Sequence, residues 1–343
     1  MTSPSDPFGP DPAKTEQGFE SPNALASLQT IVADELRLPV AADVEWLAEQ
    51  IAASHGDTVL GVLFYGSCLR QDSADGILDF WIVVEDYRAA YSRGWHSRIN
   101  HIAPPNVFYV EREREGRSLR AKYGVIDHKA FGKGTSLAAW HPYIWSRFAQ
   151  PARVLACRDE KAQEFFVDSV TNAILSMVAN LVCVLPARGN SLRFSLAAFW
   201  QEAFRRTYDS ERRPETEEFI RSLYLTNEAR YDAVAALALN HLTSIGHFQE
   251  ASAHPRSFHV TLSDSAKRWG RFRWRLMRSY ARVLGLVRLA KTAVTFGDWV
   301  PYVLWKLERH TGRRLELSER QRKHPLIFAW PIIIPLLFRR NLR

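Results

Sequence analysis

A glycine–serine pair followed by an acidic strand is the part of this sequence whose residue types could do chemistry. The apolar run Val59–Tyr65 ends in Gly66 and Ser67, and a second apolar run begins a few residues later with Asp79 near its entrance. Glycine lets the backbone approach a phosphate closely, and the serine hydroxyl and nearby N–H groups can donate to phosphate oxygens. A carboxylate on the adjacent strand can hold Mg²⁺ against the same phosphates. This spacing predicts a nucleoside triphosphate site of the kind that nucleotidyltransferases build.

The same residues also fit a plainer structure. A tight turn between two strands commonly contains glycine and serine, with a solvated aspartate at its edge. A short motif remains a hypothesis until its context agrees. Cys68, beside the turn, fits a small packing residue better than a nucleophile, because phosphoryl transfer depends on positioning and charge rather than on a covalent thiol.

Further segments follow in an order that resembles one known family. They are Trp95-His96-Ser97-Arg98-Ile99-Asn100, residues 106–109, Lys122-Tyr123-Gly124-Val125-Ile126 and residues 147–155. Together with the Tyr-Gly-Ser segment and Gln71, they resemble the mitochondrial-type phosphatidate cytidylyltransferase family, also called the translocator assembly and maintenance family. The resemblance weakens after residue 160 and sharpens again at residues 295–299 and 302–306.

This resemblance implies CTP as the nucleotide, phosphatidic acid as the acceptor and Mg²⁺ as the metal cofactor. It implies catalytic roles for Asp79, which would ligate the metal, and for Lys122, whose side chain could reach the phosphates as a point charge. The implied nucleotide-binding and phosphate-binding residues are Gly66, Ser67, Gln71, Lys122, Tyr123 and Gly124. The implied substrate contacts are His96, Asn100 and Tyr109.

Two features depart from the family pattern. Nucleotidyltransferases usually carry two acidic residues at alternate positions of the metal-binding strand, and Trp81 occupies the second position here. Glu111 and Asp127, each on or after a neighbouring expected strand, are the candidates for the missing ligand. The segment between Tyr109 and Lys122 is also shorter than in the mitochondrial members, where another strand usually lies.

Some of these residues have structural interpretations as well. A lysine at the start of a strand is commonly solvated, and Lys122 gains its weight from the resemblance. His96 and Asn100 lie four apart, so they would share one face of a helix, where His96 could donate to a phosphate or hydrogen-bond its neighbours. No zinc-type spacing of histidine or cysteine occurs, and the three separated cysteines indicate a reducing compartment without a disulfide framework.

The pattern of apolar residues predicts an α+β protein. Residues 1–22 are expected to be a disordered leader, 23–135 a nucleotidyltransferase-type domain with a mixed sheet, 136–264 a mostly helical second domain, and 265–343 a basic helical tail. A helix is expected over residues 41–54 and strands over 107–111 and 121–126. The family resemblance suggests that the second domain is winged-helix-like.

The tail differs from the rest of the chain in charge. From residue 267 onward there are 19 Lys and Arg against 4 Asp and Glu, whereas the preceding part has 26 against 33. Such a basic tail indicates an anionic partner, either a membrane surface or a nucleic acid. Residues 325–338 form an apolar run that is shorter than the ~20 residues needed to span a bilayer, contains three prolines and has basic flanks.

This run fits an interfacial membrane segment, and the alternative is a segment that packs on the protein's own core. Nucleic acid is not expected as a partner. Cations alternate with aromatic residues at 271–275, a pattern that can bind single strands, but the apolar run would have no use there. The expected location is therefore the cytoplasmic face of the inner membrane, as a peripheral protein.

These patterns lead to a primary hypothesis and two alternatives. The primary one is a CTP:phosphatidate cytidylyltransferase that makes CDP-diacylglycerol and pyrophosphate in phospholipid biosynthesis. The alternatives are a nucleotidyltransferase of the same fold with another acceptor, and a non-catalytic membrane-associated scaffold, which the lost second carboxylate favours. The identity of the base comes from the resemblance alone, and the sequence fixes neither acyl preference nor oligomeric state.

Overall fold

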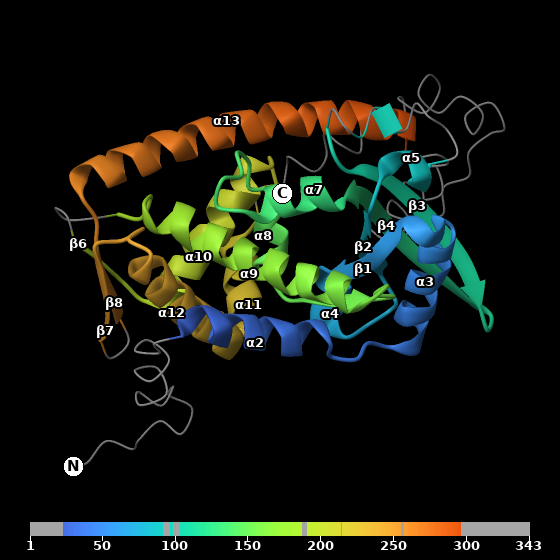
Figure 1. Ribbon diagram of the computed structural model, residues 1–343, viewed down its shortest axis with the longest axis horizontal. Helices are drawn as coiled ribbons and strands as arrows, with labels where there is room; N and C mark the ends of the chain where they lie inside the picture. The colour runs from blue at the N-terminus through green and yellow to red at the C-terminus, as the bar shows by residue number, and fades with distance from the viewer. Residues whose placement is uncertain are drawn as a thin grey trace, which may run out of the picture.

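The chain folds into an α+β architecture with a mixed sheet at one end and a mostly helical body beside it (Figure 1). The computed structural model describes residues 23–91, 97–98, 100, 103–186, 191–213, 215–254 and 257–295. The expected fold class is confirmed. The leader, His96 and the apolar run at 325–338 lie outside the described residues.

The larger sheet has five strands in the order β3-β4-β2-β1-β5. Its members are β1 (Val59–Tyr65), β2 (Ile77–Val84), β3 (Asn106–Arg114), β4 (Arg117–Asp127) and β5 (Ala152–Leu155). Strands β2 and β4 pair in parallel, and the other neighbours are antiparallel. The short segment between Tyr109 and Lys122 is a hairpin, whose two loop residues, Glu115 and Gly116, have φ of 50° and 75°. Positive φ at both positions is the requirement of a type I′ turn, which matches the twist of the strands.

Both faces of this sheet are covered. Helices α3 (Ala42–Ala53) and α5 (Tyr87–Ala90) share a buried cluster with Phe64, Phe80 and Val125 on one face. Alternate residues of the same strands, including Leu63, Trp81 and Ile126, join the core of the helical body on the other face. A strand buried on both sides is a continuous apolar run, which is how β1 and β2 read in the sequence.

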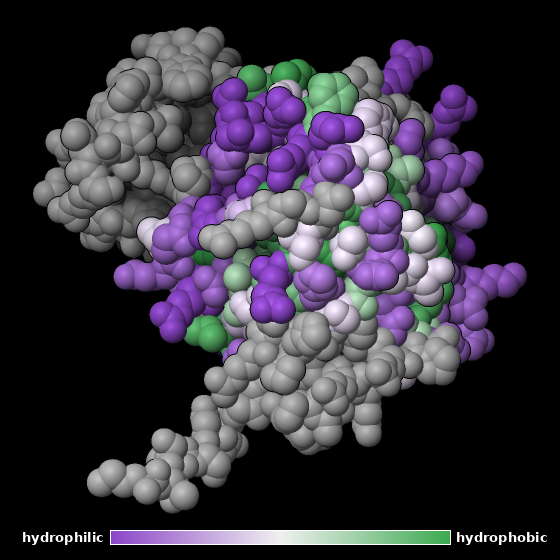
Figure 2. Space-filling view, turned by 90° about the vertical axis from the view of Figure 1, so that its left-hand side faces the viewer, coloured by the Kyte–Doolittle hydropathy of each residue, from purple (hydrophilic) through white to green (hydrophobic). Residues whose placement is uncertain are grey.

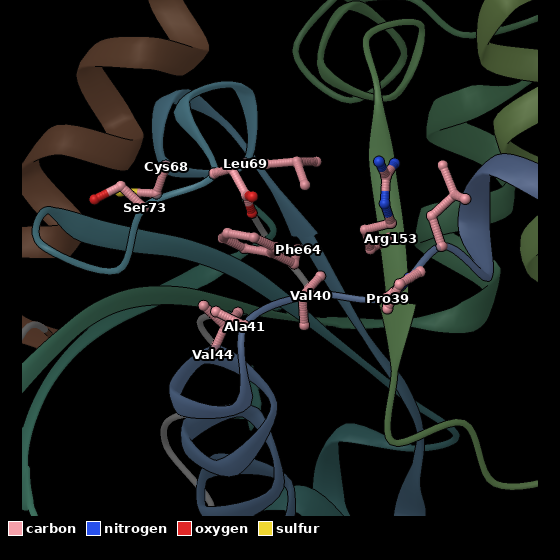
Figure 3. Close-up of a pocket in the computed structure, with 11 residues that line it drawn as sticks. Pro39, Val40, Ala41, Val44, Phe64, Cys68, Leu69, Ser73 and Arg153 are labelled. Atoms are coloured by element: carbon pink, nitrogen blue, oxygen red, sulfur yellow. The ribbon is translucent and has the colours of Figure 1, made fainter.

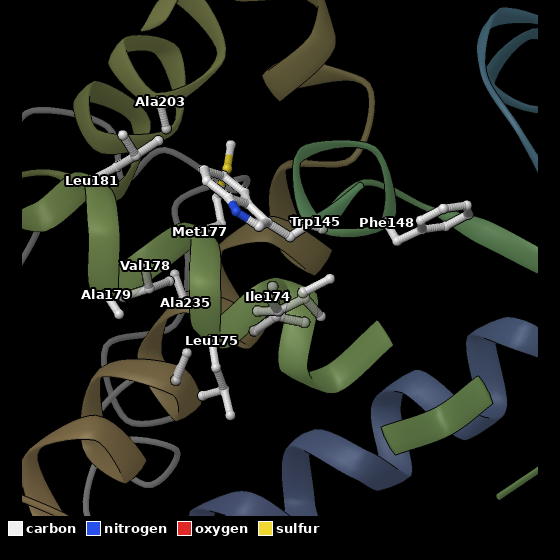
Figure 4. Packing of buried hydrophobic residues seen from close by; sticks show 14 of the residues in the cluster. Trp145, Phe148, Ile174, Leu175, Met177, Val178, Ala179, Leu181, Ala203 and Ala235 are labelled. Atoms are coloured by element: carbon white, nitrogen blue, oxygen red, sulfur yellow. The ribbon is translucent and has the colours of Figure 1, made fainter. Parts of the chain in front are cut away.

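The helical body is built around one long helix, α9 (Glu160–Val182). Its start is fixed by Asp159, whose carboxylate accepts a 2.8 Å hydrogen bond from the Ala162 N–H. The helix is long and apolar enough to cross a membrane, but 78% of its most apolar window is buried inside the protein. Figure 4 shows why, because side chains of α9 such as Met177 and Leu181 pack among Trp145, Ala203 and Ala235 from neighbouring helices.

The remaining elements surround α9 and the sheet. They are α2 (Ala24–Leu36), the 3₁₀ turn η1 (Gly56–Thr58), α4 (Ser67–Gln71), α7 (His128–Thr135), α8 (Trp145–Phe148), α10 (Leu196–Ser210), α11 (Glu217–Leu225), α12 (Glu228–Ser244) and α13 (Asp264–Thr295). A second sheet of three strands, in the order β6-β8-β7, lies at the far end of the body and consists of β6 (Ser191–Phe194), β7 (Glu250–His254) and β8 (Ser257–Thr261).

The sheet and the helical body interleave along the chain. Strand β5 lies beyond residue 135 and pairs with β1, whereas α2 lies before it and packs on α9 and α12. An ion pair of 2.6 Å between Glu35 of α2 and Arg230 of α12 fixes this arrangement, and Glu35 also accepts a hydrogen bond from the Ala152 N–H of β5. Contacts therefore cross the expected boundary at residue 135.

Helix α13 lies along the outside of the molecule and contacts both parts (Figure 1). Over the helical body, Arg273 donates to the carbonyl of Leu137 at 2.8 Å. Toward the sheet, Arg288 and Lys291 donate to the carbonyls of Pro104 and Pro105 at 2.9 and 2.7 Å. These contacts connect the helical body to the segment that enters β3.

Candidate phosphate site on the central sheet

The turn after β1 requires glycine for two independent reasons. Gly66 has φ of 95°, in the region that side chains rarely adopt. A Cβ at this position would also lie 2.9 Å from Oδ2 of Asp79. Ser67, the next residue, is exposed and begins α4. The structure therefore brings the glycine–serine turn against the acidic side chain of β2, as the sequence predicted.

A row of polar side chains crosses the sheet at this level. Strand pairing places Tyr65, Asp79, Lys122 and Tyr109 opposite one another on β1, β2, β4 and β3. Residues paired in this way point to the same face of a sheet, and this face is the one turned toward the helical body. Lys122 Nζ lies 2.8 Å from Oδ1 of Asp79, and the two side chains are 38% and 21% exposed. The pair is thus formed but open to a solute.

Tyr65 is a member of this row that the sequence analysis did not select. Its hydroxyl accepts a 3.2 Å hydrogen bond from Nε1 of Trp81, and its ring packs 5.6 Å from that of Phe148. Burial and the nearby Asp79 carboxylate raise the pKa of Tyr65 to about 12. The Tyr-Gly-Ser sequence was the available signal for this residue.

Trp81 explains why a second carboxylate is missing from β2. It lies on the same face as Asp79, two positions along the strand, and it is 2% exposed. Its ring packs edge-on against Phe148, with centroids 5.4 Å apart. A carboxylate at this position would be buried in an aromatic core without a partner, which is costly.

The structure does not bring Glu111 to Asp79. Glu111 lies on the same face, but on β3, with β4 between it and β2, a separation of about 10 Å between strands. Its carboxylate already pairs with Arg120 at 2.7 Å and accepts a 3.2 Å hydrogen bond from the hydroxyl of Tyr109. Burial first, and Glu111 second, raise the pKa of Tyr109. At this end of the row, Glu111 is therefore already paired with Arg120 and Tyr109.

The structure does not bring Asp127 to Asp79 either. Asp127 ends β4 and pairs with Val84, at the opposite end of β2 from the glycine–serine turn. Its Oδ1 accepts a 2.7 Å hydrogen bond from the Ala130 N–H and so caps α7. Within the described residues no three side chains among His, Cys, Asp and Glu are grouped to hold a metal ion. Asp79 is therefore the one predicted metal ligand that the structure leaves beside the turn.

The Lys-Tyr-Gly segment divides between the two faces of the sheet. Lys122 points to the row, whereas Tyr123 points to the α3 face, where its ring stacks on Phe108 at 5.4 Å. Burial raises the pKa of Tyr123 to about 12. Gly124 lies under Pro105, because a Cβ there would be 3.0 Å from Cγ of that proline. Tyr123 and Gly124 thus have packing roles in this structure.

The other expected contacts also lie away from the row. Asn100 is fully buried on the α3 side and donates to the Tyr91 hydroxyl at 3.0 Å and to the Val125 carbonyl at 2.8 Å. Gln71 is exposed at the end of α4. His96, which was expected to share a helix face with Asn100, lies outside the described residues.

A largely buried cluster of arginine and tyrosine side chains lies near the row. The Tyr143 ring is held between two guanidinium groups, with Arg147 and Arg288 at 3.9 and 3.7 Å from its centroid. Arg147 is fixed by Glu211, at 2.7 Å between Nη2 and Oε2. The Tyr143 ring lies 5.9 Å from that of Trp81, and Arg147 and Tyr143, like Asp79 and Lys122, act electrostatically on the Tyr65 hydroxyl.

The same two arginines contribute to the pKa of His141. Burial lowers its pKa to about 3, with Arg288 and Arg147 as further causes. The imidazole therefore stays neutral where two guanidinium groups already lie close. Arg147 belongs to a segment that carried the family resemblance, but neither Tyr143 nor Arg288 stood out in the sequence.

A pocket beside α4 is a separate feature. A pocket of about 340 Å³ lies on the α3 side of the sheet, between α4 and the connection from α2 to α3 (Figure 3). Apolar residues such as Val40 and Phe64 line it, together with the Arg153 side chain. Asp79 and Lys122 do not line this pocket, so it is not the phosphate site.

Comparison with known proteins adds no assignment. No protein-family model matches this chain, and no curated protein sequence matches it. Membership of the phosphatidate cytidylyltransferase family thus stays a prediction from the sequence.

Proposed function

We propose that this chain is a CTP:phosphatidate cytidylyltransferase that makes CDP-diacylglycerol and pyrophosphate as a peripheral protein on the cytoplasmic face of the inner membrane. The observation that carries the proposal is the contact of the Gly66–Ser67 turn with Asp79, which in turn pairs with Lys122 on an accessible sheet face. Cytidine and the lipid acceptor come from the sequence resemblance.

The chemistry of this reaction suits a site made of charges. An oxygen of the phosphatidate phosphate attacks the α-phosphorus of CTP, and the bond from that phosphorus to the bridging oxygen breaks as pyrophosphate leaves. The attacking oxygen is already anionic, so no strong general base is required. The barrier lies in bringing anions together in line, and positioned cations and donors lower it.

Each residue of the turn and the row has a role in this proposal. The backbone at Gly66 and the hydroxyl of Ser67 would donate to phosphate oxygens. Lys122 would exchange the Asp79 carboxylate for a phosphate oxygen when the nucleotide binds, since both are anions within reach of one ammonium group. Arg147 and Arg288 would stabilise the accumulated negative charge from the helical side.

The donor set is compatible with Mg²⁺. This ion is usually held by one or two carboxylates together with phosphate oxygens and water, and Asp79 supplies one carboxylate directly beside the turn. When bound, the ion would neutralise phosphate charge and polarise the reacting phosphorus. Asp79 is the residue that would hold it.

A direct assay tests the proposal. Full-length protein is incubated with Mg²⁺, CTP and vesicles that contain phosphatidic acid, and both pyrophosphate and CDP-diacylglycerol are measured. We expect both products in equal amounts from the native protein. Formation of neither product, under conditions in which the protein is folded and binds the vesicles, would refute the proposed function.

One observation favours a second candidate, a non-catalytic scaffold. Asp79 is the single predicted metal ligand beside the turn, and Lys122 already neutralises it. Binding of CTP without turnover, whatever the acceptor, would support this candidate. Release of pyrophosphate with a soluble or different lipid acceptor, but not with phosphatidic acid, would instead identify a nucleotidyltransferase of another specificity.

A further inference from the structure

Helix α13 carries an exposed apolar face that the fold does not use. Seven large apolar side chains on it are 42% to 61% exposed, and all but Leu286 lie along one line of the helix. They recur at spacings of three and four residues, so they form one continuous stripe. We call them the outer stripe: Trp269, Phe272, Leu276, Tyr280, Val283 and Val287.

The position of α13 is fixed by its other face. Trp274, Met277 and Ala281 are buried against the helical body, at 5%, 0% and 5% exposure. Arg282 of the same helix pairs with Asp209 of α10 at 3.1 Å. The inner face therefore accounts for the folding of the helix. The outer stripe, by contrast, is largely exposed to solvent, and its Tyr280 ring also lies 6.1 Å from the ring of His141.

Arginine residues flank the outer stripe. Arg268, Arg271 and Arg275 are exposed and lie on one side of it along the helix. From residue 265 to residue 295 the sequence contains no acidic residue. An exposed apolar patch with a basic rim marks an interaction site for an anionic, partly apolar partner.

We propose that the outer stripe and its arginine flank dock this protein on an anionic lipid bilayer. The stripe is about 27 Å long at 1.5 Å per residue, and α13 forms an outer edge of the whole molecule (Figure 1). The exposed side of a straight helix on a convex edge can meet a plane along its full length. Figure 2 shows hydrophobic residues at this upper edge beside a band of hydrophilic ones.

The residue types agree with a lipid surface. Trp269 and Tyr280 belong to the types enriched at the membrane–water interface. The arginines complement acidic headgroups, and lipid tails take up the aliphatic side chains. The proposal concerns binding and stands without the proposed function. If both hold, α13 brings the site of the row to the surface where a lipid acceptor lies.

Co-sedimentation of the full-length protein with vesicles tests the docking surface. The vesicles contain phosphatidylcholine with or without phosphatidylglycerol, and no phosphatidic acid, so that binding at a catalytic site does not enter. We expect binding to the anionic vesicles that weakens as salt rises. Leu276→Glu with Val283→Glu should lower the partition coefficient about tenfold or more, because two apolar contacts are lost and two negative charges are added.

A matched variant controls for the general effect of added charge. Leu225 and Ile245 are 50% and 53% exposed on the helical body, away from α13. The pair Leu225→Glu and Ile245→Glu should bind as the native protein does. A second variant on the docking surface, Arg268→Gln with Arg271→Gln and Arg275→Gln, should lose about fivefold per arginine and most of its salt dependence.

Several results would overturn the proposal. The docking variants could bind as the native protein does, or no more weakly than the control. The stripe variant could convert a dimer into a monomer with vesicle binding unchanged, which would make the stripe an interface with a second copy. Finally, Ile332→Glu with Ile333→Glu could abolish binding while both docking variants retain it, which would assign docking to the apolar run at 325–338.

Discussion

The two faces of the central sheet use the same strands for opposite purposes. On the α3 face, Tyr123 stacks in an aromatic cluster and Asn100 satisfies a buried carbonyl. On the other face, one residue away along β4, Lys122 reaches Asp79 beside the glycine–serine turn and remains accessible. Both faces are packed, but at the level of the turn the α3 face carries aromatic side chains whereas the face toward the helical body carries an accessible ion pair.

This difference shows that the residues of a motif on a strand must be assigned to one or the other face of the sheet before they are given roles. Successive residues of a strand point to opposite faces, so a conspicuous run such as Lys122-Tyr123-Gly124 cannot act as one unit. Only alternate members can meet a ligand on one side. If the comparison is correct, substitutions on the two faces must separate activity from stability, as the following predictions require.

The largest effect is expected for Asp79→Asn. The variant keeps the shape of the side chain but loses the charge that would hold Mg²⁺, so turnover should fall by a factor of at least about 10² to 10³. Pyrophosphate release under the standard assay measures it. Asp75→Asn is the control, because Asp75 lies nearby and is 83% exposed in its pair with Arg117. Equal activity of both variants would remove Asp79 from the site.

Gly66→Ala should be more destabilising than the same change at Gly116. Both glycines have positive φ, at 95° and 75°, so each variant pays the conformational cost of about 1 kcal/mol. Only at Gly66 would the new Cβ also meet Asp79, at 2.9 Å, whereas Gly116 has open space. We expect about 1–3 kcal/mol more loss of unfolding free energy at Gly66, measured by urea denaturation.

Equal losses at the two glycines would show that Asp79 is not packed against the turn. The comparison between them is sharper than either measurement alone. Their shared backbone requirement cancels, and the difference reports the contact that defines the proposed site.

Lys122→Met and Asn100→Ala should separate the two faces directly. Lys122→Met removes a partly exposed ion pair, which contributes about 0–1 kcal/mol, so stability should change little while activity falls strongly. Asn100→Ala removes two buried hydrogen bonds, to the Tyr91 hydroxyl and to the Val125 carbonyl, and should cost about 1–3 kcal/mol of stability. Its activity per folded molecule should be nearly native. The reverse pattern would contradict the division of the sheet.

Much of this arrangement could be predicted from the sequence. The apolar runs and the glycine–serine pair indicated β1, the turn and β2, and helical spacing indicated α3 and α9. Strand β5 and the second sheet were missed, because strands of four or five residues carry too little alternation to stand out. The β-hairpin of β3 and β4 accounts for the short segment before Lys122.

The site was predicted less completely than the fold, for reasons that only contacts reveal. Glu111 and Asp127 are acidic residues on neighbouring strands, as a metal ligand would be. However, Glu111 already pairs with Arg120, and Asp127 caps the N-terminus of α7. Tyr65 and the Arg147–Tyr143–Arg288 stack depend on packing between segments far apart in the chain. No local sequence pattern predicts such contacts between distant segments.

The smallest expected effect concerns His141, which lies near Arg147 and Arg288. Its pKa is lowered from 6.5 to about 3, by burial first and then by Arg288 and Arg147. Between these two values the unfolded chain binds more protons than the folded protein, so folding stability must rise with pH through this window and fall as pH decreases.

We expect His141→Gln to flatten that slope by about 1–2 kcal/mol between pH 6.5 and 4, measured by urea denaturation across pH, with little change above pH 7. His128 forms an exposed contact with the Glu85 carbonyl, so His128→Gln is the matched control for replacing an imidazole with an amide. A slope that persists in His141→Gln would mean that His141 does not have the lowered pKa that burial first, and then Arg288 and Arg147, impose on it.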